Sequence, residues 1–108
     1  MNICIYGAAS PELAQIYYDK TEELGRQMAK RGHGLVFGGG ETGLMGAAAR
    51  GVDAEGGYLL GIAPRFFDEP GILYQHCTEF IMTETMRERK YLLEEKSQAT
   101  IVVPGGIG

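Results

Sequence analysis

The stretch GLVFGGGETGLMGAAARG, residues 34–51, contains an apolar run, a glycine-rich loop and an alanine-rich segment in direct succession. Its first four residues predict a buried strand, because they form a short apolar run bounded by glycines. The segment from about residue 43 to 55 predicts a helix, since it carries Leu44, Met45 and four alanines. A strand that passes through glycines into a helix is the repeating unit of α/β proteins.

Four more apolar runs, at residues 2–6, 58–63, 79–82 and 100–103, extend this pattern along the chain. They lack the polar alternation of half-exposed strands and are typical of strands covered on both faces. Together with the helices between them, they predict a parallel sheet in a Rossmann-like, doubly wound α/β fold.

Two further helices are indicated by their end signals. The first is predicted from Ser10, as N-cap, through Pro11 at the first helical position to Gly32. Another is predicted from Thr85, which has capping-box spacing to Glu88, to about residue 96.

Composition limits the class of protein. The 108 residues are 44% hydrophobic and 22% charged, which suits a single globular domain. A formal net charge of -4 argues against nonspecific binding to nucleic acid or to an anionic membrane surface. No apolar run approaches the roughly 18 residues of a membrane span, and the start MNICIYGAAS lacks the features of a signal peptide. We therefore expect a cytoplasmic location.

The cysteines and histidines predict neither a metal site nor a disulfide. Cys4 and Cys77 lie far apart in sequence, and His33 and His76 are isolated from them and from each other. Both cysteines are expected to be reduced residues of the core.

Glycine-rich loops follow three of the predicted strands, at the edge where α/β proteins bind ligands. The loop at residues 7–10 precedes a helix and is compatible with an anion site or with a plain tight connection. In the second loop, Gly38-x-Gly40-x-x-Gly43 formally matches a dinucleotide-binding fingerprint. The end of the next strand has no acidic residue to bind a ribose hydroxyl, so the sequence gives little support to NAD binding. Gly39, Gly40 and Gly43 are candidate phosphate or ribose contacts, with tight packing as the alternative.

The third loop, PGGIG at residues 104–108, has the composition of an anion nest formed by backbone N–H groups. No helix follows it to cover the sheet. We therefore expect residues 1–108 to be the amino-terminal part of a longer Rossmann-like domain.

The segment TETMRERKYLLEEK, residues 83–96, places Met86, Arg89, Lys90 and Leu93 on one side of a helix. Taken alone, it is compatible with a solvated charged helix. Taken in order, FGGGETGLMG, MRERK and PGGIG resemble the LONELY GUY family of cytokinin riboside 5'-monophosphate phosphoribohydrolases, also labelled possible lysine decarboxylases. The resemblance covers essentially the whole chain, including the CIYGAAS start, where Ala8 and Ala9 replace the family's usual serines.

The resemblance implies a homodimeric enzyme without a cofactor. Such an enzyme hydrolyses the N-glycosidic bond of AMP or N6-substituted AMP to the free base and ribose 5-phosphate. It implies that Arg89 is catalytic and that Met86, Arg89 and Lys90 contact the substrate. The family's phosphate loop corresponds to Gly105, Gly106, Ile107 and Gly108.

The family's T-x-x-E glutamate follows that loop and is outside the 108 residues, so these residues alone are expected to have negligible hydrolase activity. The alternative reading is a nucleotide or cofactor carrier with similar loops and no hydrolysis. Asp68 and Glu69, in the loop RFFDEPGILYQH, are further candidates for substrate contact, with exposed loop acids as the simpler reading.

Overall fold

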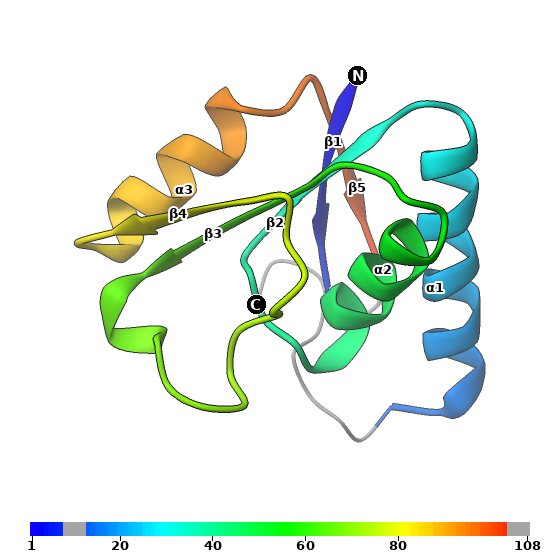
Figure 1. The fold of residues 1–108 in the computed structure, drawn as a ribbon, viewed down its shortest axis with the longest axis horizontal. Coiled ribbons are helices and arrows are strands. Elements are labelled where there is room, and N and C mark those ends of the chain that lie inside the picture. Colours follow the sequence, from blue (N-terminus) through cyan, green and yellow to red (C-terminus); the bar gives the residue numbers. More distant parts are fainter. Residues whose placement is uncertain (8–12, 104–108) are drawn as a thin grey trace.

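The computed structural model describes residues 1–7 and 13–103, and within them five strands form one parallel sheet (Figure 1). The order across the sheet is β4-β3-β2-β1-β5. The strands are β1 (Asn2–Tyr6), β2 (Gly34–Phe37), β3 (Leu59–Pro64), β4 (Glu79–Thr83) and β5 (Ala99–Val102). These bounds agree with the predicted strands to within one or two residues, and the parallel arrangement confirms the predicted fold class.

Each central strand contributes apolar side chains to both faces, because successive residues of a strand point in opposite directions. On one face, Ile5, Phe37 and Leu59 pack with residues of the first two helices. On the other face, Val36 and Ile62 pack with Leu93 of the third helix. This double burial explains why the strands read as continuous apolar runs.

The helices α1 (Gln15–Lys30) and α2 (Gly43–Ala54) cover one face of the sheet, and α3 (Met86–Glu95) covers the other (Figure 1). The first two pack closely against each other at a pair of glycines. A Cβ at Gly25 would collide with the carbonyl oxygen of Ala48, and a Cβ at Gly51 would collide with that of Glu22. The two glycines therefore allow backbone-to-backbone contact that no larger residue permits.

The predicted start of α1 is wrong. The helix begins at Gln15, four residues later than expected, and Ala14 before it is extended and provides no side-chain cap. Ser10 and Pro11 lie outside the described residues. The predicted end at Gly32, which has φ +78°, and the Thr85 cap of α3 are confirmed.

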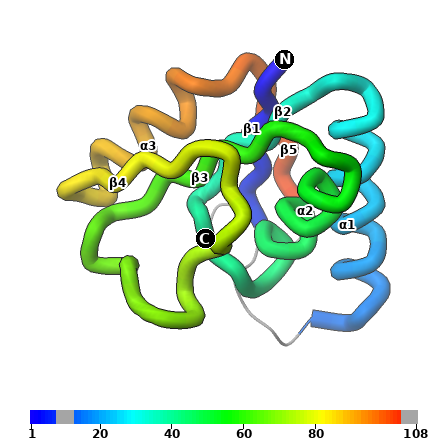
Figure 2. The backbone as a smooth tube through the Cα atoms, in the orientation of Figure 1, coloured from blue at the N-terminus to red at the C-terminus, as the bar shows by residue number. Residues whose placement is uncertain are grey.

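The connection from β3 to β4 contains no α-helix. It consists of the short 3-10 helix η1 (Arg65–Phe67) and an irregular segment at residues 68–78. Backbone bonds join this segment to the glycine loop: the Tyr74 N–H donates to the Gly39 carbonyl over 2.8 Å and the Glu41 N–H donates to the Ile72 carbonyl over 2.9 Å. Figure 2 shows the long excursion of the chain between these strands. A loop therefore covers the part of the sheet that a crossover helix would otherwise cover.

None of the helices formed by the described residues is long and apolar enough to cross a membrane. Within the same residues there is no group of three or more histidine, cysteine or acidic side chains that could hold a metal ion. Cys4 and Cys77 are free thiols, the first buried and the second half-buried.

Candidate functional site

Arg89 reaches from α3 across the carboxyl ends of β2 and β3. Its Nε donates a hydrogen bond to the Ile62 carbonyl over 3.1 Å, and its Nη2 donates one to the Gly38 carbonyl over 3.0 Å. The guanidinium carbon lies 5.8 Å from the centre of the Phe67 ring, within the range of a cation–π contact. Three different segments therefore fix the orientation of this side chain.

The charge of Arg89 is not neutralised by an acidic residue in the described part of the chain. The ion pairs there involve Arg26, Arg50, Arg65 and His76. Burial lowers the pKa of the half-buried Arg89 guanidinium, and Tyr6 and Cys4 act in the opposite direction. An arginine remains charged under such a shift, because its ordinary pKa is above 12. The result is a desolvated cation held by two carbonyl dipoles, with further N–H groups available to an anion.

Arg89 lines a cavity of about 170 Å³, which we call the Arg89 cavity. Its other walls come from the glycine loop and the start of α2, from Phe67 of η1 and from the irregular segment; they are Gly38, Gly40, Thr42, Met45, Phe67, Gly71, Ile72 and Leu73. None of these lining residues is acidic. Thr42 is the N-cap of α2, so the positive end of that helix dipole faces the same space as the guanidinium.

The structure separates the predicted site residues into three groups. Arg89 and Gly40 line the cavity, whereas Gly39 and Gly43 have positive φ angles of 80° and 71° and shape the loop beside it. Met86 and Lys90 are exposed on α3 and are not among the residues that line the cavity. Gly105, Gly106, Ile107 and Gly108 lie outside the described residues, so their assignment to the phosphate loop stays a prediction.

Sequence reasoning missed the contribution of the connection between β3 and β4. Phe67, Ile72 and Leu73 line the cavity, and Leu73 is 5% exposed. The available signal was the group of apolar residues in a loop that also contains proline and glycine, because connecting loops run over the surface and are usually rich in polar residues. The two acids proposed from this loop, Asp68 and Glu69, are both exposed, and Asp68 also lines a neighbouring cavity.

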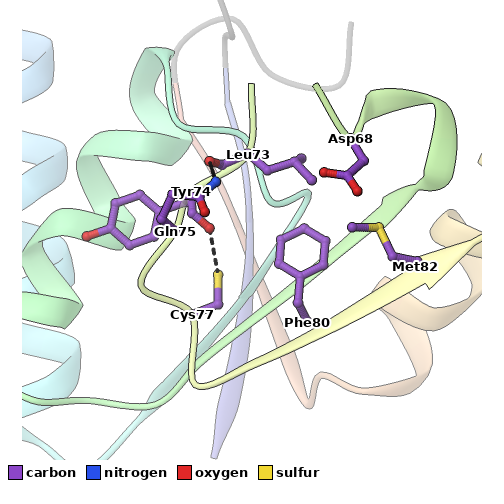
Figure 3. A pocket seen from close by; sticks show the side chains of 7 residues that line it. All are labelled: Asp68, Leu73, Tyr74, Gln75, Cys77, Phe80 and Met82. Atoms are coloured by element: carbon purple, nitrogen blue, oxygen red, sulfur yellow. Dashed lines mark hydrogen bonds between the residues drawn. The ribbon is translucent and has the colours of Figure 1, made fainter. Parts of the chain in front are cut away.

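That neighbouring cavity, which we call the Phe80 cavity, has a volume of about 210 Å³. It is lined by Asp68, Leu73, Tyr74, Gln75, Cys77, Phe80 and Met82 (Figure 3). Leu73 belongs to the lining of both cavities. Figure 3 shows Asp68, Leu73, Phe80 and Met82 converging on one space, whereas the ring of Tyr74 points away from it.

Comparison with curated proteins finds relatives that bear the same enzyme name. A phosphoribohydrolase of Mycobacterium tuberculosis, named cytokinin riboside 5'-monophosphate phosphoribohydrolase, is 40% identical over 106 residues, which are 98% of this chain and 56% of the relative. An Arabidopsis thaliana protein of the same name is 34% identical over 98% of this chain and 46% of its own length. The chain thus spans about half the length of these curated relatives.

Solved structures match the fold closely. The molybdenum cofactor binding protein of Rippkaea orientalis superposes with a TM-score of 0.82 at 22% identity, covering 98% of this chain and 63% of that one. The Moco carrier protein of Chlamydomonas reinhardtii gives a TM-score of 0.81 at 26% identity, covering 99% and 64%. The model of the SLOG cluster4 family matches residues 1–108. With that match over its whole length, and with relatives that bear the name anticipated from its motifs, the chain belongs to the SLOG cluster4 family.

Proposed function

We propose that the intact protein hydrolyses the N-glycosidic bond of AMP or of N6-substituted AMP. Water adds to C1' of the ribose, the bond from C1' to the base nitrogen breaks, and the base leaves with a proton as ribose 5-phosphate is formed. The names of the curated relatives support this substrate class. The observation that carries the proposal is Arg89, a desolvated cation at the carboxyl ends of β2 and β3 with no acidic partner among residues 1–7 and 13–103.

Arg89 suits an anionic substrate for geometric reasons. The two carbonyl bonds hold the guanidinium plane in place before a ligand arrives, and its remaining N–H groups can bind phosphate or ribose oxygens. A preorganised donor binds without first being reoriented, which is the condition for strong electrostatic stabilisation. The adjacent amino end of α2 adds a favourable dipole for the same negative charge.

The reaction also needs a carboxylate. Cleavage of a glycosidic bond passes through an oxocarbenium-like state, which a carboxylate beside the sugar stabilises. The resemblance assigns this role to the glutamate after the PGGIG loop, and no acid lines the Arg89 cavity in the described part of the chain. We therefore propose that residues 1–108 by themselves release little or no base.

The test is an assay of base release from AMP and from N6-isopentenyl AMP by the intact protein and its Arg89→Ala variant. Loss of a hydrogen bond to a charged group is worth about 1.5–3 kcal/mol, so kcat/KM is expected to fall by about tenfold to 150-fold. Arg87→Ala is the matched control, because Arg87 is an exposed arginine of the same helix. Unchanged turnover in Arg89→Ala would show that the site has been misassigned.

A carrier function is the second candidate, favoured by the close superposition on the Moco carrier protein. A carrier uses the same cavity to bind a ligand and returns it unchanged. Binding of AMP that depends on Arg89, without release of base or ribose 5-phosphate by the intact protein, would favour the carrier and contradict the hydrolase.

A further inference from the structure

The 3-10 helix η1 carries two adjacent aromatic side chains with different surroundings. Phe66 is 61% exposed, whereas Phe67 is half-buried and lines the Arg89 cavity. The two rings meet edge to face, with their centres 5.1 Å apart and their planes at 89°. One ring of the pair thus faces solvent, and the other lies against the guanidinium of Arg89, whose central carbon is 5.8 Å from the Phe67 ring centre.

The backbone places Phe67 beside Arg89. Strand β3 supplies Ile62, whose carbonyl accepts from Nε of Arg89, and η1 follows that strand directly. The Glu69 N–H donates to the Phe67 carbonyl over 2.8 Å, which restrains the chain at the base of the ring. A single strand with its following turn therefore brings both a carbonyl dipole and an aromatic ring to one cation.

The contact with Phe67 uses none of the N–H groups of Arg89. A guanidinium has five N–H groups, and the carbonyls of Ile62 and Gly38 each accept from one of them. The quadrupole of an aromatic ring attracts the cation without accepting a conventional hydrogen bond. An acidic partner would instead neutralise the charge and occupy N–H groups that an anionic ligand needs. Phe67 therefore orients the cation without competing with the ligand.

The setting of Arg89 strengthens this contact. Its side chain is half-buried, and the ion pairs among the described residues do not include it. Because less water surrounds the cation, the attraction to the ring is screened less than at an open surface. Phe67 thus replaces part of the solvation that Arg89 loses.

We propose that Phe67 is a positioning residue, whose ring holds the guanidinium of Arg89 in the orientation that binds the phosphate end of the substrate. This inference rests on the proposed function, because that function supplies the anionic substrate. Phe66 has no such role, since it is exposed and is not among the described residues that line the cavity.

The experiment replaces Phe67 in the intact protein and measures two quantities. NMR titration gives the Kd of ribose 5-phosphate, and release of base from AMP gives kcat/KM. Phe67→Leu keeps an apolar side chain but removes the ring, so both quantities should worsen by roughly fivefold to 30-fold, the strength of a cation–π contact in a partly to fully desolvated site. Phe67→Tyr keeps the aromatic face and should stay within about twofold of the wild type.

Phe66→Leu is the matched control. It makes the same change one residue earlier, at an exposed position, and should leave both quantities at their wild-type values. An equal loss in Phe66→Leu and Phe67→Leu would show a general effect on η1 and overturn the proposal.

Fluorinated phenylalanines at position 67 separate the electronic role of the ring from its shape. Monofluoro-, difluoro- and trifluorophenylalanine have nearly the shape of phenylalanine, but each added fluorine reduces the negative charge of the ring face. The affinity for ribose 5-phosphate should therefore fall stepwise along the series. A constant affinity would overturn the proposal, because a ring that only fills space does not respond to fluorine in this way.

The Arg89→Ala background tests whether Phe67 acts through the arginine. In that background, Phe67→Leu should cause no further loss; a persisting loss would mean that the ring contacts the ligand directly and would overturn the positioning role. Binding that depends on the ring without any release of base would refute the hydrolase function while supporting the role of Phe67. Release of base with equal kcat/KM in the wild type and Phe67→Leu would have the opposite meaning, so the two proposals can fail separately.

Discussion

At the scale of single residues, the candidate site depends on a glycine that leaves room for an arginine. A Cβ at Gly38 would collide with Nη2 of Arg89, the nitrogen that donates to the carbonyl of Gly38 itself. Gly38 is thus a positioning residue for the guanidinium. Neither of the neighbouring elements, β2 and α3, shows this dependence in its own sequence, because the two residues are 51 positions apart.

We expect Gly38→Ala to displace Arg89 and lower kcat/KM of the intact protein by about 100-fold, the effect of a misplacement of about 1 Å. The guanidinium group of Arg89 is at the far end of a flexible side chain and can move away, so the fold should tolerate the change. A double-mutant cycle with Arg89→Ala is the decisive measurement. If the glycine acts through the arginine, the double variant is no slower than Arg89→Ala; additive losses would exclude this role.

Tyr74 provides a prediction about pH. Its hydroxyl donates to Oδ2 of Asp53 over 2.9 Å, and burial together with this bond raises the pKa of Tyr74 from 10.0 to about 12. The folded protein therefore retains the phenolic proton at a higher pH than the unfolded chain does. The stabilisation is complete below pH 10 and is lost as the pH rises towards 12.

Urea unfolding at pH 9 and pH 11 tests this linkage in the wild type and in Tyr74→Phe. The wild type should lose more unfolding free energy between the two pH values, because the phenylalanine has no proton to release. Other tyrosines and the cysteines titrate in both proteins and cancel in the comparison. A parallel decline of the two proteins would contradict the assigned role of the Tyr74 hydroxyl.

At the scale of elements, the predictable features were those with local signals. The Thr85 N-cap, which accepts from the Glu88 N–H, and the glycine stop after α1 depend on neighbouring residues, and the structure has both. The order of the strands and the formation of the Arg89 and Phe80 cavities depend on contacts between distant segments. Thus Leu73 pairs with Gly40, and Phe80 packs on Gly39 and Gly61, contacts that no local pattern encodes.

The crossing of α1 and α2 is one such nonlocal feature. Alanine has a higher helix propensity than glycine by about 1 kcal/mol, so a local argument predicts that Gly51→Ala stabilises α2. The crossing predicts the opposite, because a Cβ there would collide with the backbone of Glu22. We expect a net loss of about 1–3 kcal/mol in unfolding free energy, as for other overpacked contacts.

Urea denaturation of Gly51→Ala and of Ala54→Gly measures this effect. Ala54 is the exposed last residue of the same helix and reports propensity alone, with an expected loss of less than about 1 kcal/mol, because the full glycine penalty applies to helix interiors. Stabilisation of the chain by Gly51→Ala would show that the two helices can separate at this point without loss.

At the scale of the whole molecule, one face of the sheet is covered in two different ways. The α1 and α2 layer is closed by glycine contacts, whereas the region over β3 and β4 on the same face is covered only by the irregular segment. The absence of a crossover helix there leaves space for the Phe80 cavity. The topology places the only long irregular connection among the described residues beside the glycine loop. Both the Arg89 cavity and the Phe80 cavity result from this placement.

Self-association is the prediction that belongs to this scale. Large apolar side chains are exposed on both helical layers: Ile16 of α1 is 59% exposed, and Tyr91 of α3, the helix that carries Arg89, is 64% exposed. Soluble oligomers most often form with twofold symmetry, so we expect the intact protein to be a homodimer. Sedimentation equilibrium at micromolar concentration should give twice the mass of one chain. Ile16→Glu and Tyr91→Glu then identify the helix at the interface, because a buried unpaired charge should shift the equilibrium to monomer in only the variant whose residue is covered. A wild-type protein that stays monomeric throughout this concentration range would contradict the prediction and leave both helices as solvent-exposed surfaces.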